Sequence, residues 1–416
     1  MRRRQKNPEM LLFFIMISAA ALGNGMSDSV YANYFKEAYQ VSATQRALIE
    51  IPRELPGLLC AVVIASLSML GDIRTSLIAQ VLACVGLTAL GLFRPSFGVM
   101  LIFLFINSMG MHLFMPLQDS IGMRLAEPGQ VGSRVGQYAS IKMLCGFAAG
   151  LIVFFGFRLG LFSFSRPVNP LFLLGAGAFL VAAVAAFMLT AREKAAHPVR
   201  RKSKLVFRKE YRFFYLLTML HGVQKQIAFV FGAWVLVDLL LKKADVMSLL
   251  LISASFISIF FMRGVGRWID RFGIKRIMYL DALTFIVIYV IYGFMVWGIS
   301  SRILPDAGWP VMVIYGLFVL DRLSMQIGVV KSVYLKSIAV TQEEITNALS
   351  TGISLDHIVS ILAAQVSGFI WTVWGPQWVF FFAAFFSLGN LFVAWRVRIP
   401  DKTPEVKVVP SPDILR

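Results

Sequence analysis

The sequence predicts an all-α membrane protein with twelve transmembrane helices, arranged as two pseudo-symmetric six-helix bundles. Composition, the length of the apolar runs and an internal repeat support this fold class. Of the 416 residues, 58% are hydrophobic and only 15% are charged, whereas roughly a quarter of a soluble domain is charged. The mean hydropathy is +0.74. This composition excludes a soluble enzyme and a disordered chain.

Twelve apolar runs are long enough to cross a bilayer, because a hydrocarbon core of about 30 Å needs about 20 apolar residues in a helix. None shows the short alternating pattern of a β-barrel strand. The predicted spans are 10–35, 44–70, 75–93, 97–123, 134–157, 170–190, 212–240, 245–263, 277–299, 310–337, 345–373 and 377–396.

The first run also has features of a signal peptide, since a basic segment precedes Leu11–Gly23 and small residues follow near Ala19–Ala21. A helical pattern that continues to Phe35 favours a retained first span. Removing that span would also leave an odd number of helices.

The basic residues set the predicted orientation. The chain has 40 Lys and Arg against 22 Asp and Glu, a net charge of +18. With the N-terminus in the cytoplasm, 28 of these basic residues fall on the cytoplasmic side and 9 at the outer side. This bias follows the positive-inside rule and predicts cytoplasmic termini in a cell membrane. The bias accounts for most of the net positive charge, so nucleic-acid binding is not needed to explain that charge.

The longest polar stretch between spans divides the chain into two halves. We expect a six-helix bundle over 1–190, a basic cytoplasmic linker over 191–211, a second bundle over 212–398 and a cytoplasmic tail over 399–416. Phosphoregulation or binding of anionic lipid is possible in the linker, although a solvated basic segment explains its composition more simply.

The loop after the eighth span carries a specific motif, Gly-Arg-Trp-Ile-Asp-Arg-Phe-Gly-Ile-Lys-Arg. It resembles the loop signature of the major facilitator superfamily. The matching residues are Gly266, Asp270, Arg271, Gly273, Lys275 and Arg276. A degraded copy with Asp72 lies after the second span, 198 residues earlier, as duplicated halves predict.

The resemblance implies alternating access by two six-helix bundles around a central site. It also implies that the motif latches the cytoplasmic gate, with Asp270 near the start of the fifth span around Ser133–Gly136. The sequence departs from the family's antiporter motif in the fifth span, where Gly146 and Gly150 predict close helix packing. This departure weakens assignment to typical proton-antiporting drug exporters.

Ionisable side chains inside the spans are the candidates for function, because each costs at least about 2.5–3.5 kcal/mol at mid-bilayer. In the first span, Asn24, Asp28 and Tyr31 share one helical face. An isolated Asp28 suits proton coupling, whereas an Asp28 held ionised by a basic partner suits gating. Both roles remain open.

The second span contains Ile-Glu-Ile-Pro-Arg-Glu-Leu-Pro. Its prolines predict a kink that frees backbone carbonyls. Glu50 and Arg53 can neutralise each other locally, which leaves Glu54 as an outer-gate or substrate group. In the fourth span, Asn107 and His112 lie at mid-depth.

The second half has its own set of polar residues. Lys225 lies near the midplane of the seventh span, and the repeat offset places Gln226 opposite Asp28. We expect Lys225 either to face the cavity or to pair with Asp28 or Glu54. The tenth and eleventh spans carry coupling, gating or substrate candidates: Asp321, Arg322, Gln326, Asp356 and His357. Charge would be balanced if Arg322 paired with Asp356 and His357 paired with Asp321.

The predicted function is secondary transport of a small organic solute, with an organic ion or zwitterion as the favoured class. Because no nucleotide-binding motif is present, the driving force is a gradient of protons or another ion, or a gradient of the substrate itself. Proton coupling through Asp28, Glu54 or His357 is one hypothesis. An exporter of amphipathic drugs or lipid-like solutes is the alternative, and a receptor or scaffold on the same fold is a remote one. We expect a monomer in the lipid bilayer, with no enzymatic activity, no cofactor, no metal and no nucleic acid.

Overall fold

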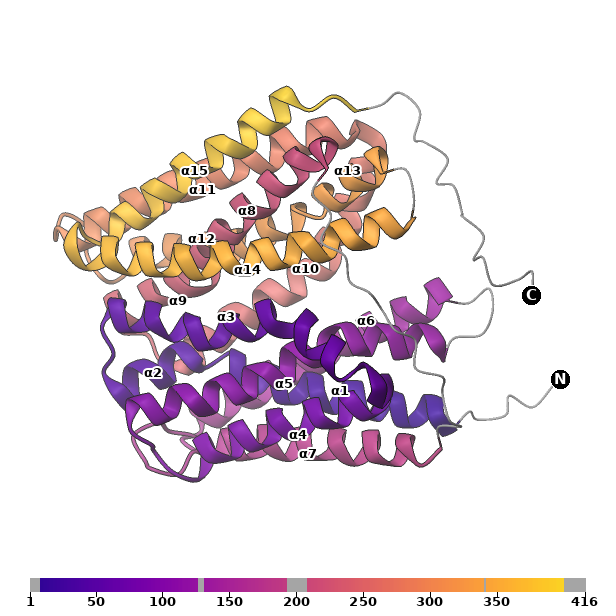
Figure 1. Ribbon diagram of the computed structural model, residues 1–416. Helices are drawn as coiled ribbons and strands as arrows, with labels where there is room; N and C mark the ends of the chain where they lie inside the picture. The colour runs from indigo at the N-terminus through magenta and orange to yellow at the C-terminus, as the bar shows by residue number, and fades with distance from the viewer. Residues whose placement is uncertain (1–7, 126–130, 193–207, 340–341, 400–416) are drawn as a thin grey trace. The chain divides into compact units, whose positions relative to one another are not determined.

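The computed structural model describes residues 8–125, 131–192, 208–339 and 342–399 (Figure 1). All the regular elements in these ranges are helices. The chain packs as two compact units, 1–202 with 236–256 and 203–235 with 257–416. Most of the predicted linker and tail lie outside the described residues, so the predicted domain boundaries stay a prediction.

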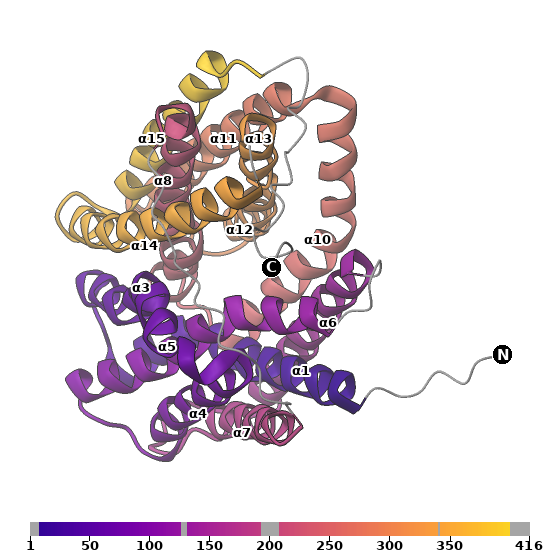
Figure 2. The ribbon, with the colours of Figure 1, turned by 45° about the vertical axis from the view of Figure 1, so that its right-hand side comes forward.

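The first unit holds α1 (Pro8–Asp28), α2 (Tyr31–Tyr39), α3 (Ala43–Ser66), η1 (Ser68–Leu70), α4 (Gly71–Leu92), α5 (Phe97–Arg124), α6 (Val131–Arg158) and α7 (Pro170–Thr190). The helices α1, α4 and α7 pack side by side in this unit (Figures 1 and 2).

The second unit holds η2 (Lys209–Tyr211), α8 (Arg212–Gln226), η3 (Ile227–Phe231), α9 (Gly232–Trp234), α11 (Ile274–Ser300), α12 (Trp309–Ile327), α13 (Val330–Ile338), α14 (Gln342–Val373) and α15 (Pro376–Arg396). Both η4 (Val235–Leu239) and α10 (Ala244–Phe272) run from one unit into the other. Within the second unit α11 packs along α15, and α8 packs on α14 and α15.

The predicted fold class is confirmed. Within the described residues, eleven segments are long and apolar enough to cross a membrane, and α3 is the twelfth span. Large apolar side chains such as Leu174, Phe187 and Phe385 are exposed on the outside of the helices, as contact with lipid requires.

The first span is broken, although its sequence pattern reads as one helix. The helix α1 ends at Asp28 and α2 begins at Tyr31. At the break, the Ser27 and Ser29 hydroxyls donate hydrogen bonds to carbonyls of the preceding turn, and Val30 N–H bonds to the Ser27 carbonyl. Serine hydroxyls compete in this way with the regular helical ladder. The predicted shared face of Asn24, Asp28 and Tyr31 therefore spans a helix break.

Two later spans are also irregular. The seventh contains two π-helical segments, η3 and η4, after Gln226, and such bulges often occur at functional sites. The tenth is divided into α12 and α13 at Gly328–Val329. The second span, by contrast, stays one helix, α3, with Pro52 and Pro56 inside it.

Close packing sets the positions of α1 and α6. A Cβ added to Gly25 would lie 2.8 Å from Ala149 Cβ and 3.4 Å from Gly146 Cα. Only a glycine on α1 permits this approach, because any larger residue would push the two backbones apart. The contact aligns α1 with α6 and defines the relative height of their polar residues.

The two loop motifs turn at glycines with positive φ, Gly71 at 78° and Gly273 at 82°, which favour glycine over other residues. Asp72 lies in the first turn of α4, after its glycine, whereas Asp270 lies in the last turn of α10, before its glycine. The two aspartates matched by the 198-residue offset therefore occupy different positions relative to the turn.

Candidate functional site

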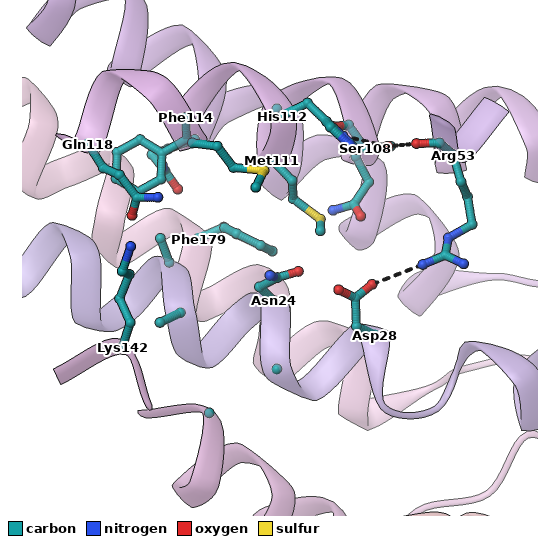
Figure 3. Close-up of a pocket in the computed structure, with 18 of the residues that line it drawn as sticks. Asn24, Asp28, Arg53, Ser108, Met111, His112, Phe114, Gln118, Lys142 and Phe179 are labelled. Atoms are coloured by element: carbon teal, nitrogen blue, oxygen red, sulfur yellow. Dashed lines mark hydrogen bonds and ion pairs between the residues drawn. The ribbon is translucent and has the colours of Figure 1, made fainter. Parts of the chain in front are cut away.

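A cavity of about 500 Å³ opens within the first unit (Figure 3). Its volume falls in the range of sites for small organic ligands. Seven residues predicted for the substrate site or the gate line it: Asn24, Asp28, Tyr31, Arg53, Glu54, Asn107 and His112. The helix break after Asp28 and the proline-containing helix α3 form part of its wall.

An ion pair marks one end of the cavity. Arg53 Nη2 lies 3.3 Å from Asp28 Oδ1, and the Arg53 guanidinium covers the Tyr31 ring at 5.3 Å. The Asp28 side chain is 41% exposed, so its carboxylate remains accessible. Ser108 Oγ donates a 2.6 Å hydrogen bond to the Arg53 carbonyl, which ties α3 to α5 between the two prolines.

Arg53 also pairs with a second carboxylate, that of the buried Glu50. Arg53 Nη1 donates to Glu50 Oε1 at 2.9 Å, which confirms the predicted local pair. Arg46 Nη1 donates to the same oxygen at 2.5 Å. Arg46 is fully buried and also contacts the Phe35 ring. Arg46 lies in the first turn of α3. The sequence did not predict its burial, because hydropathy along one helix does not show which neighbour covers a side chain.

Two predicted polar residues already bond each other. Tyr31 donates a 3.0 Å hydrogen bond to Asn107 Oδ1, and Asn107 Nδ2 donates to the Ala83 carbonyl at 2.9 Å. His112 Nδ1 lies 2.9 Å from the Ser108 carbonyl. These bonds set the side-chain directions at the cavity wall.

Lys142 occupies the other end of the cavity, where Gln118 also lines the wall (Figure 3). Among the described residues no ion pair or hydrogen bond to Lys142 is present. The sequence places Lys142 only near the cytoplasmic end of its helix, so its position in the cavity was missed. Gln80 also lines the wall and was missed, since a glutamine in a span gives a weaker signal than a charge.

Apolar side chains also line the cavity, among them Leu104, Met111, Phe114, Met115 and Phe179. Asn24 lies between the Asp28 end and the Lys142 end (Figure 3). A solute in this cavity therefore meets charged groups at the two ends and a mixed wall of hydrophobic side chains and uncharged polar groups.

The polar residues of the second unit form a separate ion-paired cluster. Lys225 Nζ lies 2.8 Å from Asp356 Oδ2, and His221 Nδ1 lies 3.3 Å from Asp356 Oδ1. Asp356 thus pairs with two residues of α8 and not with Arg322, the partner that charge balance along the sequence suggested. A hollow of about 10 Å³ near His221, Asp281 and Lys331 is too small for a solute.

Arg322 lies between two aromatic rings, with its guanidinium carbon 4.3 Å from the centroid of Phe229 and 4.5 Å from that of Phe318. Such stacking stabilises a partly desolvated guanidinium. Asp321, Gln226 and His357 are buried in the same unit, and Gln326 donates to Ser258. None of these predicted site residues lines the cavity of the first unit.

In the gate motif, Lys275 connects the start of α11 to the end of α15. Lys275 Nζ donates to the Trp395 and Val397 carbonyls, both at 3.1 Å, at the end of α15. Gly266, Asp270, Arg271 and Arg276 are exposed, and in the first copy Ser120 donates to Asp72. The side chains of 133–136 lie outside the described residues, so the predicted latch to Asp270 stays a prediction.

Comparison with known proteins agrees with this architecture. The model of the Major Facilitator Superfamily matches residues 13–329. No match to a curated protein sequence was found. Among solved structures, the nucleoside transporter NupG is 12% identical over 94% of this chain and 100% of its own, with a TM-score of 0.71.

Two further structures have the same fold. A POT family transporter in complex with 5-aminolevulinic acid is 12% identical over 93% of this chain and 95% of its own, with a TM-score of 0.73. A D-xylose-proton symporter is 14% identical over 94% and 97%, with a TM-score of 0.69. This protein is therefore a multi-pass membrane protein of the secondary-transporter type, and its chain belongs to the Major Facilitator Superfamily.

Proposed function

We propose that this transporter carries a small organic ion or zwitterion across a cell membrane by alternating access, through the cavity beside Asp28. The observation that supports this proposal most directly is the cavity itself, with Asp28 accessible at one end and Lys142 at the other. Charged groups at both ends suit an ionic solute, because each is costly to hold in a membrane without an opposite charge nearby.

The proposal includes the arrangement in the membrane. The chain works as a monomer with an N-terminal bundle over 1–190 and a C-terminal bundle over 212–398, and both termini lie in the cytoplasm. The distribution of Lys and Arg along the sequence supports this orientation. No catalytic chemistry is assigned to the chain.

Transport itself is tested in two steps. Purified full-length protein is first screened for thermal stabilisation against a panel of metabolites, because a ligand that binds only the folded state raises the melting temperature. Uptake of the stabilising solutes is then measured in proteoliposomes. We expect charged metabolites of one class to stabilise the protein and to be taken up. A solute that binds without any flux would instead support a receptor or scaffold.

Proton coupling is the second part of the proposal. Asp28 faces Arg53, Glu50, Glu54 and Tyr31, so a change in its protonation alters the charge balance of the whole ion-paired group. We expect an inward proton gradient to change the rate of uptake, and Asp28→Asn or Glu54→Gln to abolish this dependence. A pH response that both variants retain in full would reject these carboxylates as the coupling groups.

The alternative function, transport of amphipathic or lipid-like compounds, is favoured by the apolar side chains of the cavity wall, such as Met111, Phe114 and Phe179. It predicts that many unrelated lipophilic cations compete for binding. A charged metabolite site predicts competition only within one chemical class, so the same competition assay separates the two functions.

A further inference from the structure

We propose that the cavity binds its substrate as an elongated zwitterion, with the cationic group at Asp28 and the anionic group at Lys142. This inference rests on the proposed function, since it defines the substrate class of the same cavity. It follows from four features of the first unit: the accessible carboxylate, the lysine at the opposite end, the separation of these two groups and the net charge of the wall.

The Asp28 end suits a cation. Asp28 is 41% exposed, and its ion pair with Arg53 is 3.3 Å long. Arg53 has a shorter, buried partner in Glu50 at 2.9 Å. A substrate ammonium can therefore bind the Asp28 carboxylate while the Arg53 guanidinium keeps its hydrogen bond to Glu50, whose carboxylate it shares with Arg46.

The Lys142 end suits an anion. An ammonium without an acidic partner is costly in the membrane interior, and a carboxylate or similar group on the substrate would offset that cost. Both acids that line the cavity, Asp28 and Glu54, belong to the end near Arg53. Gln118 lines the wall beside Lys142 (Figure 3) and supplies a hydrogen-bonding amide to the same group.

The separation of the two ends follows from the contact between α1 and α6. Gly25 packs on Gly146 and Ala149, so Asp28 lies on the outer side of this contact and Lys142 on the cytoplasmic side. The two residues are then about 10–15 Å apart along the helix axes, at 1.5 Å per residue. The side chains and their hydrogen bonds cover part of this distance, and the apolar side chains of the wall suit a short methylene chain across the remainder.

The charge balance of the wall favours a zwitterion over a simple ion. Two acids, Asp28 and Glu54, and two bases, Arg53 and Lys142, line the cavity. A lone organic cation would leave Lys142 without an acidic partner among the described residues, and a lone anion would leave the accessible Asp28 carboxylate to Arg53 alone. A substrate with both charges satisfies both ends without changing the net charge.

The experiment uses the purified full-length transporter and a homologous series of unbranched ω-amino carboxylates from 4-aminobutanoate to 8-aminooctanoate. Alkylamines and alkanoates of the same lengths serve as half-molecules. Binding is measured by thermal stabilisation and by calorimetry. We expect an optimum chain length in the amino carboxylates. We also expect binding of both half-molecules to be weaker by about 10- to 100-fold, the equivalent of one charge-assisted hydrogen bond of about 1.5–3 kcal/mol.

Charge reversal tests the orientation of the ligand. In Lys142→Glu the cavity has acids at both ends, so we expect preference to change from the amino carboxylate to the α,ω-diamine of the same length. Binding of the diamine also shows that the variant is folded. The exposed Lys336→Glu is the matched control and should keep the original preference.

Three results overturn the inference. These are binding of no member of the series, equal binding of half-molecules and amino carboxylates, or an unchanged preference in Lys142→Glu. The proposed function fails by a different result, the absence of flux for any solute of the metabolite panel in proteoliposomes. Flux of a simple cation or anion would reject the zwitterion and leave the transporter function standing.

Discussion

Lys225 and Asp356 form a 2.8 Å ion pair that joins α8 to α14 inside the second unit. Their side chains are 22% and 15% exposed, so the pair is largely removed from water. His221 contacts the second carboxylate oxygen at 3.3 Å. Each charge is costly in a membrane by itself, and the pairing explains how both are accommodated.

Lys225→Gln should destabilise the protein, because it leaves the Asp356 carboxylate without its closest cation. Removing one member of a buried pair typically costs about 3–5 kcal/mol. The melting temperature in detergent should fall, and the double variant Lys225→Gln with Asp356→Asn should lose less than the sum of the single variants. Additive losses would show that the two residues are not energetically coupled.

Glu50→Gln should be the most destabilising change in α3. It removes the carboxylate that two guanidinium groups share, Arg53 at 2.9 Å and the fully buried Arg46 at 2.5 Å. The expected loss is about 3–5 kcal/mol. Arg46→Met should cost less, since Arg53 still compensates Glu50 and the methionine fills the apolar space beside Phe35. Thermal unfolding of the purified variants checks the order, which the reverse ranking would contradict.

Gly110→Ala should force α4 and α5 apart, because the new Cβ would overlap the Ala79 carbonyl oxygen. We expect a loss of about 1–3 kcal/mol from overpacking and weaker ligand binding, since Gly110 also lines the cavity. Gly177→Ala on α7 is the control, because nothing lies within 4 Å of its added Cβ. The control should be neutral or slightly stabilising through its higher helix propensity. Equal effects at the two positions would exclude steric overlap as the cause.

Lys36 on α2 pairs with Asp238 on η4, both in the first unit and about one quarter exposed. We expect Lys36→Glu to slow uptake by about two- to five-fold, as two acids now repel each other at a partly solvated site. The exchanged pair, Lys36→Asp with Asp238→Lys, should recover most of the wild-type rate. Uptake in proteoliposomes is the measurement, and an exchanged pair as slow as the single variant would argue against a role for this ion pair.

The sequence by itself determined the fold class and the number of spans, because apolar composition is a local property that adds up along a helix. It also identified the loop motif around Asp270, and it placed Asn24, Asp28 and Asn107 among the cavity candidates. These polar residues stand out against an apolar background, so their cost in lipid can be recognised without a structure.

Tertiary structure alone decided which charges meet. The positions of Arg46 and Lys142, the partner of Asp356 and the break after Asp28 all depend on how one helix is rotated against another. Helix rotation is set by contacts between residues far apart in the sequence, such as Gly25 with Ala149, and a hydropathy pattern contains no information on them. The sequence therefore determined which polar and charged side chains lie within the membrane spans, where each raises the free energy of the protein. The packing of the helices decided which partner offsets that free energy.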